Sequence, residues 1–482
     1  FLIFYMSGKI KLYNTLSRKK DKFKPIKSDK VGIYTCGPTV YWYQHIGNLR
    51  SYVNWDLLKR FLLAENYKVK HVINVTDVGH LTSDADEGED KIEQRAKKEK
   101  KRVSDIVIES TKIFFEDLKK LNAKNPSTLF PKASEHIGEQ IAFVKTLEEK
   151  GYTYKTNDGI YFDTSKFKEY GKLGEIDIEG LQEGARVTEN PEKLHHTDFA
   201  LWKFSNPEEK RQQEWKSPWG IGFPGWHLEC SAMAMKHLGS KLDIHTGGID
   251  HIPIHHNNEI AQTESVTGEE FAKYWLHVAH ITIEGKKISK SLGNQILLRN
   301  ITDRNISPLA YRYWLLTAHY RSQVNFTWEA LEGAQTALIR LHRFFLERLG
   351  KVRSGNIVLH YQEKFHTYIN DDVDTPKAIA LLHDFMKDET ISLADVRATF
   401  LDFDQVLGLG FRESSKKLLE NLSGKQKVAV SAIPKKAKEL LEMREQAREN
   451  KDWVEADRLR DELSLLGYTI ADTENGPKIM TK

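Results

Sequence analysis

Cysteine and long apolar runs are both scarce in this sequence. The chain of 482 residues contains 2 cysteines, and it has no stretch of about 18 consecutive apolar residues, the length that crosses a bilayer. Two cysteines cannot supply a disulfide framework for so long a chain, so we expect a reducing, cytoplasmic setting. The missing apolar runs exclude a membrane protein, and a hydrophobic fraction of 40% with 10% aromatics excludes a mainly disordered one.

The first residues do not resemble a secretion signal. Phe1 to Tyr5 are apolar, but they lack a basic n-region and a small-residue cleavage site. We therefore expect no signal peptide here and regard Met6 as a candidate start.

A strong excess of either charge is also lacking. The 72 Lys and Arg residues are nearly balanced by 68 Asp and Glu residues, so the composition permits nucleic-acid binding without requiring it. One local excess lies between Arg412 and Lys438, where eight basic residues accompany only Glu413 and Glu420. We interpret the other basic run, residues 97–102, as a solvated helix face.

β-rich runs alternate with helical periodicity in two separate parts of the chain. A strand at Val31–Thr35, a helix at Leu49–Ala64 and a strand at Val69–Val75 form a βαβ pattern. Two further strand patterns, Leu242–His245 and Trp275–Ile283, flank a helix that starts near His255 and ends before Gly268. The sequence therefore predicts an α/β protein with a parallel nucleotide-binding sheet, split by an insertion at about residues 125–217.

The second part of the chain is expected to be mainly helical. From about Ser307 the glycines thin out and apolar residues recur at spacings of three and four. Near the C terminus, Asp452 precedes another helix, and Tyr468–Ile479 is typical of a small hairpin.

Four residues could together bind a metal ion. Cys36 and Cys230 both lie beside Gly or Pro turns, and His255 and Glu259 are four residues apart on one helix face. Thiolate, imidazole and carboxylate are ligands that zinc accepts in tetrahedral sites. The alternative is two inert buried thiols and a surface His/Glu pair, because free cysteine is among the most buried residue types.

Two polar segments could bind phosphate. His45-Ile46-Gly47-Asn48 precedes the first long helix, where free backbone N–H groups favour an anion; a simple polar N-cap is the alternative. In the segment Lys287–Asn294, Lys287 and Lys290 flank hydroxyl residues and suit a leaving pyrophosphate, unless this is a solvated basic loop.

A third segment follows a predicted strand. Gly248 allows a ligand to approach the backbone closely, and Asp250 could accept hydrogen bonds from ribose hydroxyls. An ordinary turn is equally compatible with these residues.

Considered together, these segments resemble a known family. The pair His-Ile-Gly-Asn and Lys-Ile-Ser-Lys-Ser is similar to the two signature motifs of class I aminoacyl-tRNA synthetases, although Asn48 stands for a second His and Ile288 for Met. Other stretches resemble the cysteinyl-tRNA synthetase family specifically: Tyr34–Tyr41, Asn74–Asp77, Gly225–Met233 and His255–Glu259. The resemblance is strong over about residues 10–323 and looser from there to the C terminus.

The resemblance implies a zinc ion and a set of substrate contacts. Its zinc ligands match Cys36, Cys230, His255 and Glu259, and the metal would bind the thiolate of substrate cysteine and so reject serine without an editing domain. The implied cysteine pocket comprises Gly37, Thr76, Trp226 and His245. The implied ATP-binding residues are His45, Gly47, Asn48, Gly248, Asp250, Lys287 and Lys290. Four of them are also expected to be catalytic: His45, Asn48, Lys287 and Lys290.

The implied reaction is adenylation of L-cysteine by ATP with Mg²⁺, followed by transfer of the cysteinyl group to the terminal adenosine of tRNA(Cys). The resemblance also implies a Rossmann-type catalytic domain, a helical bundle and a small C-terminal helix-hairpin domain. The expected divisions are residues 6–124 and 218–283 for the two catalytic halves, 125–217 for a connective insertion, 284–330 for the signature-loop and stem-contact region, 331–411 for the helical bundle and 412–482 for anticodon binding.

Two alternatives and one unexplained stretch accompany this interpretation. A related ligase of the mycothiol pathway joins cysteine to an amino-sugar, but it lacks the C-terminal region, and the basic stretch Arg412–Lys438 favours RNA. A non-catalytic zinc and RNA-binding module is the other alternative. Residues 78–90 look longer than usual for the family and carry Asp84, Asp86, Glu87, Glu89 and Asp90 for no evident physical reason.

Overall fold

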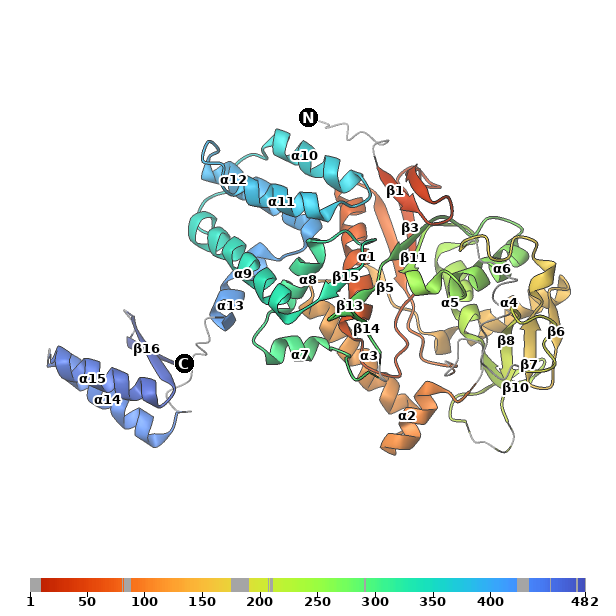
Figure 1. The fold of residues 1–482 in the computed structure, drawn as a ribbon, viewed down its shortest axis with the longest axis horizontal. Helices are drawn as coiled ribbons and strands as arrows, with labels where there is room; N and C mark the ends of the chain where they lie inside the picture. Colours follow the sequence, from red (N-terminus) through yellow and green to blue (C-terminus); the bar gives the residue numbers. More distant parts are fainter. Residues whose placement is uncertain are drawn as a thin grey trace.

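The computed structural model describes most of the chain. The described residues are 10–79, 81, 88–174, 190–206, 208, 211–289, 292–422, 433–450, 452–473 and 476–481. Figure 1 shows a main body with strands at its centre, an insertion at one side and helices at the other, and a C-terminal unit that stands apart. None of the described helices is long and apolar enough to span a membrane.

A five-stranded parallel sheet forms the centre of the main body. Its order is β12 (Ala272–Val278), β11 (Leu242–Gly248), β3 (Lys30–Thr35), β4 (Lys68–Ile73) and β5 (Thr128–Leu129). β11 pairs with β3 in parallel, with Thr246 opposite Thr35, although more than two hundred residues separate them. The predicted parallel sheet, split in sequence, is confirmed. The strand order reverses between β3 and β11, and ligands bind in α/β sheets at the carboxyl ends of strands where this happens.

Alternation along the strands places helices on both faces of the sheet. Ile33 belongs to the large hydrophobic cluster around α1 (Ile46–Ala64), whereas its neighbour Tyr34 packs in the cluster of Met233 and Ile260. Those two residues lie on α5 (Trp226–Leu238) and α6 (His255–Thr267). α6 ends at Gly268, whose φ of 72° suits glycine, as the sequence predicted.

One predicted strand is divided. The pattern at Trp275–Ile283 is not a single strand, because β12 ends at Val278 and Ile281–Ile283 forms β13 of another sheet. The Ala279 N–H donates to the carbonyl of Tyr320 at 3.0 Å, so the chain leaves the parallel sheet there. In the second sheet β13 lies between β14 (Lys286–Lys287) and β15 (Val324–Phe326).

The insertion and the residues just after it form a separate antiparallel sheet. Phe162, Leu201 and Trp202 of this sheet share a core with Leu228 of α5 and Ala261 of α6, so the insertion supports the helices beside it. The sheet order is β6 (Thr153–Lys155), β7 (Gly159–Phe162), β8 (Phe199–Phe204), β10 (Gly220–Pro224) and β9 (Trp215–Ser217), and the helix α4 (Ile137–Glu149) packs on α5.

The remaining elements are a short N-terminal hairpin and helices. β1 (Lys11–Asn14) and β2 (Lys19–Lys22) form the hairpin. The helices α2 (Lys91–Glu99) and α3 (Val103–Lys120) lie between β4 and β5 in the chain. The predicted helical part contains α7 (Leu298–Asp303), α8 (Pro308–Leu316), α9 (Trp328–Phe344), α10 (Leu359–Asn370), α11 (Thr375–Phe385), α12 (Leu393–Leu407) and α13 (Phe411–Leu422).

The acidic stretch 78–90 is described only in part. Asp84, Asp86 and Glu87 lie outside the described residues. Asp90 caps α2 by accepting from the Ile92 N–H at 2.7 Å, and it pairs with Arg211 of the insertion at 2.6 Å. The end of the stretch therefore has a structural role.

The C-terminal unit has its own small core. It consists of α14 (Lys435–Glu449), α15 (Trp453–Leu465), β16 (Tyr468–Thr473) and β17 (Gly476–Thr481), and the last two form the predicted hairpin. Leu440, Leu459 and Ile479 are buried together there. Lys425 and Lys427 of the basic stretch lie outside the described residues.

Candidate functional site

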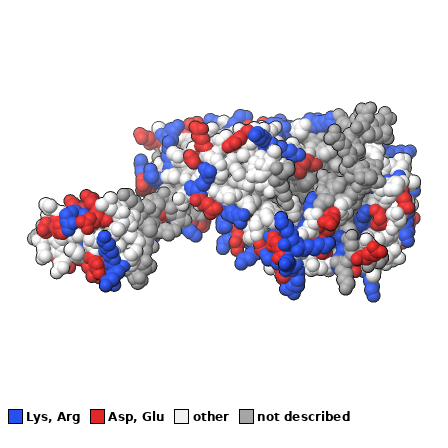
Figure 2. Space-filling model, turned by 60° about the horizontal axis from the view of Figure 1, so that its bottom comes forward, with Lys and Arg blue, Asp and Glu red and all other residues white. Residues whose placement is uncertain are grey.

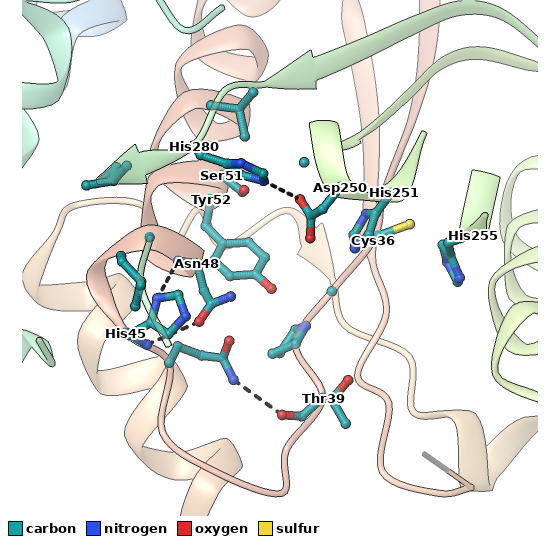
Figure 3. Close-up of a pocket in the computed structure, with 18 of the residues that line it drawn as sticks. Cys36, Thr39, His45, Asn48, Ser51, Tyr52, Asp250, His251, His255 and His280 are labelled. Atoms are coloured by element: carbon teal, nitrogen blue, oxygen red, sulfur yellow. Dashed lines mark hydrogen bonds and ion pairs between the residues drawn. The ribbon is translucent and has the colours of Figure 1, made fainter. Parts of the chain in front are cut away.

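A cavity of about 510 Å³ opens at the carboxyl ends of β3 and β11. The helix start at His45 and Asn48 forms one side, and Cys36, His255 and Asp250 form the other, as Figure 3 shows. The structure thus brings predicted residues from distant parts of the chain to one cavity. Those that line it are Cys36, Gly37, His45, Gly47, Asn48, Thr76, Trp226, Cys230, Gly248, Asp250, His255 and Lys287.

The four candidate metal ligands converge at the inner end of this cavity. Cys36 follows β3, and His255 and Glu259 lie one turn apart on α6. Cys230 was expected beside a turn, but it lies inside the helix α5, which carries it to the same place. One ligand atom from each residue lies within 4.8 Å of the others, and all four side chains are buried. Two sulfurs, one imidazole nitrogen and one carboxylate oxygen are ligands that zinc accepts, and a substrate sulfur would come to such an ion as a further ligand.

Charge at this inner end also suits a cation. Burial raises the pKa of Cys230, but hydrogen bonding from Cys36 and the nearby His255 outweigh it and lower that pKa to about 6. His245 and His255 hold the pKa of Glu259 well below its usual range in spite of burial. Burial lowers the pKa of His255, yet Glu259 and Cys230 raise it to about 10. The cluster thus pairs a thiolate and a carboxylate with a protonated His255, and a bound metal would displace that proton.

Histidines surround the candidate ligands and fix their orientation. His227 Nδ1 lies 2.9 Å from His255 Nδ1, and His245 Nε2 lies 2.9 Å from Glu259 Oε2. His256 Nε2 lies 3.2 Å from Cys36 Sγ. Such outer contacts orient metal ligands in proteins.

A second group of ligand atoms shares part of this cluster. Cys36, His245, His256 and Glu259 also offer ligand atoms within 4.8 Å of one another. His256 in turn hydrogen-bonds His277 at 2.8 Å, and His277 hydrogen-bonds Thr15 at 2.7 Å. His227, His256 and His277 were not singled out from the sequence, where only the adjacency of His256 to His255 gave a signal.

The predicted cysteine pocket divides into residues on the cavity wall and one behind it. Gly37, Thr76 and Trp226 line the cavity, and Trp226 packs on His255 with ring centroids 4.4 Å apart. A side chain at Gly37 would place Cβ 1.5 Å from the carbonyl oxygen of Asn74, so only glycine fits. His245 is fully buried behind Glu259 and stacks on Trp275 at 4.5 Å.

His45 and Asn48 cap the first helix of the sheet reciprocally. His45 Nδ1 accepts from the Asn48 N–H at 3.2 Å, and Asn48 Oδ1 accepts from the His45 N–H at 3.3 Å. The helix start faces the cavity, so this cap and an anion site at the N terminus are compatible. At Gly47 a Cβ would lie 3.0 Å from Ile288 Cδ1, so the two signature segments meet here.

The lysine segment is described up to residue 289. Lys287 lines the cavity, and Ile288 packs inward against the main core. Asn294 stabilises the loop: its Oδ1 accepts from the Ser289 N–H at 2.9 Å and its Nδ2 donates to the Lys287 carbonyl at 3.0 Å. Lys290 lies outside the described residues.

Asp250 has a partner that was missed from the sequence. His280 Nε2 lies 3.4 Å from Asp250 Oδ1, and both residues line the cavity (Figure 3). Burial raises the pKa of Asp250, but His280 and His251 hold it well below its usual range. A Cβ at Gly248 would lie 2.3 Å from Asp250 Oδ1, so a side chain there would displace this carboxylate.

Comparison with protein families gives two matches in this chain. The family model described as tRNA synthetases class I (C) catalytic domain matches residues 22–336. The model described as Cysteinyl-tRNA ligase anticodon binding domain matches residues 431–476.

Relatives match almost the full length of the chain. Cysteine--tRNA ligase 1 of Burkholderia lata is 47% identical, over 97% of this chain and 96% of its own length. The Cysteine--tRNA ligase of Thermus thermophilus is 41% identical, over 97% of this chain and 98% of its own length.

Solved structures of class I synthetases share the fold at low sequence identity. The leucyl-tRNA synthetase of an Agrobacterium radiobacter K84 ternary complex is 12% identical, covers 83% of this chain and 86% of its own, and gives a TM-score of 0.61. Mycobacterium tuberculosis methionyl-tRNA synthetase with methionyl-adenylate is 13% identical, covers 81% of this chain and 93% of its own, and gives a TM-score of 0.53.

Proposed function

The chain belongs to the cysteinyl-tRNA synthetase family and is a cysteine--tRNA ligase, and we propose that a zinc ion at Cys36, Cys230, His255 and Glu259 selects its amino acid. Its substrates are L-cysteine, ATP and tRNA(Cys). The observation that carries the proposal is the convergence of the four ligand atoms, within 4.8 Å, at the inner end of the cavity that both signature segments line.

Zinc supplies one property that the side chains cannot. A bound zinc ion holds a substrate sulfur as a thiolate near neutral pH, whereas the hydroxyl of serine keeps its proton. Gly37, Thr76 and Trp226 line the cavity beside the ligands and would hold the rest of the amino acid. His245 would act from behind by holding Glu259, at 2.9 Å.

The chain's own residues position ATP for the first step. In this step the cysteine carboxylate attacks the α-phosphorus of ATP, a P–O bond forms, and pyrophosphate leaves, which gives cysteinyl-adenylate. His45, Gly47 and Asn48 present the helix N terminus to the phosphates, and Gly248 and Asp250 lie where the ribose would be held. Lys287 and Lys290 would stabilise the charge on the departing pyrophosphate, and Mg²⁺ would accompany ATP.

The second step consumes the adenylate. A ribose hydroxyl of the terminal adenosine attacks the activated carbonyl, an ester bond forms and AMP leaves. Positioning accounts for such a transfer, and no protein nucleophile is required.

The C-terminal unit is proposed to bind the anticodon of tRNA(Cys). The division of the chain into the six expected segments stays a prediction. The anticodon-binding model matches residues 431–476, which cover this unit up to the start of β17, and this favours an RNA acceptor over an amino-sugar. Figure 2 shows Lys and Arg side chains, interspersed with Asp and Glu, on the visible face of both this unit and the main body. Phosphate contacts by such side chains make RNA binding sensitive to salt.

One experiment tests the proposal. Cysteine-dependent exchange between ATP and pyrophosphate is measured together with zinc content, with and without tRNA(Cys). We expect exchange that depends on cysteine, about one zinc per chain, and rejection of serine by about 10⁴-fold or more. Exchange without bound zinc would refute the role of the metal, and bound zinc without exchange would favour a non-catalytic RNA-binding module.

A further inference from the structure

A buried carboxyl group lies behind the wall of the cavity. Glu229 precedes Cys230 on α5, has 0% exposure and does not line the cavity. Its Oε2 accepts a hydrogen bond from Thr76 Oγ1 at 2.8 Å. Its Oε1 has no hydrogen-bond partner among the described residues. The position of this residue suggests that it acts on the cavity through Thr76.

The direction of the hydrogen bonds around Thr76 follows from a backbone donor. The Gly37 N–H donates to Asn74 Oδ1 at 2.7 Å, so the amide nitrogen of Asn74 must face the other way. That nitrogen donates to Thr76 Oγ1 at 3.1 Å. The hydroxyl of Thr76 therefore donates its hydrogen bond to Glu229 Oε2. Oε2 accepts this hydrogen bond both when Glu229 is ionised and when its proton lies on Oε1, the oxygen without a partner among the described residues.

This arrangement leaves Thr76 with an acceptor for the ligand. A hydroxyl oxygen has one proton and two lone pairs, and here the proton and one lone pair are used by Glu229 and Asn74. The second lone pair is available on the cavity side, because Thr76 lines the cavity. A ligand group that pairs with Thr76 must therefore be a donor.

Given the proposed function, on which this inference rests, only one group of cysteine fits. The sulfur is directed to the metal ligands, and the carboxylate is an acceptor, so the α-ammonium is the remaining donor. We propose that Glu229 is a positioning residue that fixes the hydroxyl of Thr76 as the acceptor for the ammonium group of cysteine. Glu229 thereby contributes to amino-acid recognition without touching the substrate.

Binding of three thiol compounds distinguishes a role of Glu229 in ammonium recognition from a general role in stabilising the fold. L-cysteine has both charged groups, cysteamine keeps the ammonium but lacks the carboxylate, and 3-mercaptopropionate keeps the carboxylate but lacks the ammonium. Their dissociation constants are measured on the zinc-loaded full chain, by equilibrium titration, for the parent and for Glu229→Leu and Glu229→Gln. Zinc content is measured on each sample.

The expected pattern is selective. In Glu229→Leu, cysteine and cysteamine should bind about 10- to 100-fold more weakly, because a hydrogen bond to a charged group is misdirected, whereas 3-mercaptopropionate should change by less than about 3-fold. Glu229→Gln keeps an oxygen for Thr76 and should stay within about 3-fold of the parent for all three thiols.

An equal loss for all three thiols, or loss of zinc from Glu229→Leu, would overturn the proposal. If Glu229→Leu does not fold, Thr76→Val and Thr76→Ser make the same comparison: Val should lose ammonium-dependent binding and Ser should keep it, and equal behaviour of the two would overturn the proposal. These outcomes are distinct from failure of the proposed function, which would show in the parent as absent cysteine-dependent exchange or absent zinc.

Discussion

The inner end of the cavity and the C-terminal unit differ in how their polar side chains are held. At the inner end, Glu259, His245 and Cys36 are buried and contact one another from three separate elements. In the C-terminal unit, ion pairs such as Arg458 with Glu455 lie on the surface of one helix, above a small core of its own. The first region is assembled from distant segments of the main body, whereas the second is built on a core of its own residues. Changes should therefore abolish amino-acid activation in one region and affect only RNA binding in the other.

The largest effect is expected from removing a candidate metal ligand. Changes to residues that only contact a metal ligand typically cost about 10- to 100-fold in metal affinity or activity. Cys230→Ser removes a candidate ligand itself, so it should lose zinc and reduce cysteine-dependent exchange by more than about 100-fold. Zinc content and exchange rate are measured together. His237→Gln, at the far end of the same helix, is the control and should keep both. Normal zinc content in Cys230→Ser would contradict the ligand assignment.

The next largest effect is expected at the lysine segment. Lys287→Ala should slow adenylate formation by about 100-fold, because a preorganised charge at the leaving group is lost. Cysteine binding should change little, since Lys287 is not among the candidate ligands. Lys286→Ala is the matched control: Lys286 is the neighbouring exposed lysine of β14 and does not line the cavity. Pre-steady-state adenylate formation distinguishes the two, and equal rates would exclude this role for Lys287.

Removal of the C-terminal unit tests the other half of the comparison. A chain ending at Leu422 keeps α13, whose Ser415 hydrogen-bonds the buried His342 at 2.8 Å, and keeps the entire cavity. Exchange should stay within about 2-fold, because distant sites without shared partners act independently. Aminoacylation at low tRNA should fall by about 10-fold or more, with a shallower dependence on salt.

A far-UV melt first checks that this shortened chain folds. If the folded chain charges tRNA as well as the full chain does, the C-terminal unit does not bind the anticodon.

The smallest effect concerns stability of the main body alone. Burial raises the pKa of Asp117 on α3 to about 6, above the ordinary value of 3.8. The unfolded chain therefore releases this proton at lower pH than the folded chain, so stability falls as the pH rises from about 4 to about 6. Asp117→Asn should remove this loss and stabilise the protein at pH 7 by on the order of 1 kcal/mol.

Urea unfolding at pH 4, 5, 6 and 7 measures the effect. Asp303→Asn, at an exposed aspartate of α7, should leave the pH profile unchanged. If the free energy of unfolding of Asp117→Asn depends on pH as that of the parent does, burial of this carboxyl does not destabilise the folded chain.

The sequence was sufficient where local rules place residues. Strand ends bring Cys36 and Gly248 to the same edge of a sheet, and a spacing of four brings His255 and Glu259 to one face of a helix. The helix cap at His45, which the sequence offered as the alternative to a phosphate site, is present at the start of α1.

The sequence was insufficient where tertiary contacts decide. The contact of His256 with Cys36, and that of Glu229 with Thr76, depend on how α6 and α5 pack against the sheet, and no spacing along the chain encodes it. The strand pattern at residues 275–283 was divided for a similar reason: Ala279 pairs with Tyr320, which lies in a distant segment. Lys290 lies outside the described residues, so its predicted role stays a prediction.

Both cysteines of this 482-residue chain are buried at the same cavity. Translation of these 482 residues therefore uses only two molecules of cysteinyl-tRNA, the product of the reaction itself. A thiol-reactive dye added to the folded chain would report on the two candidate metal ligands Cys36 and Cys230 alone.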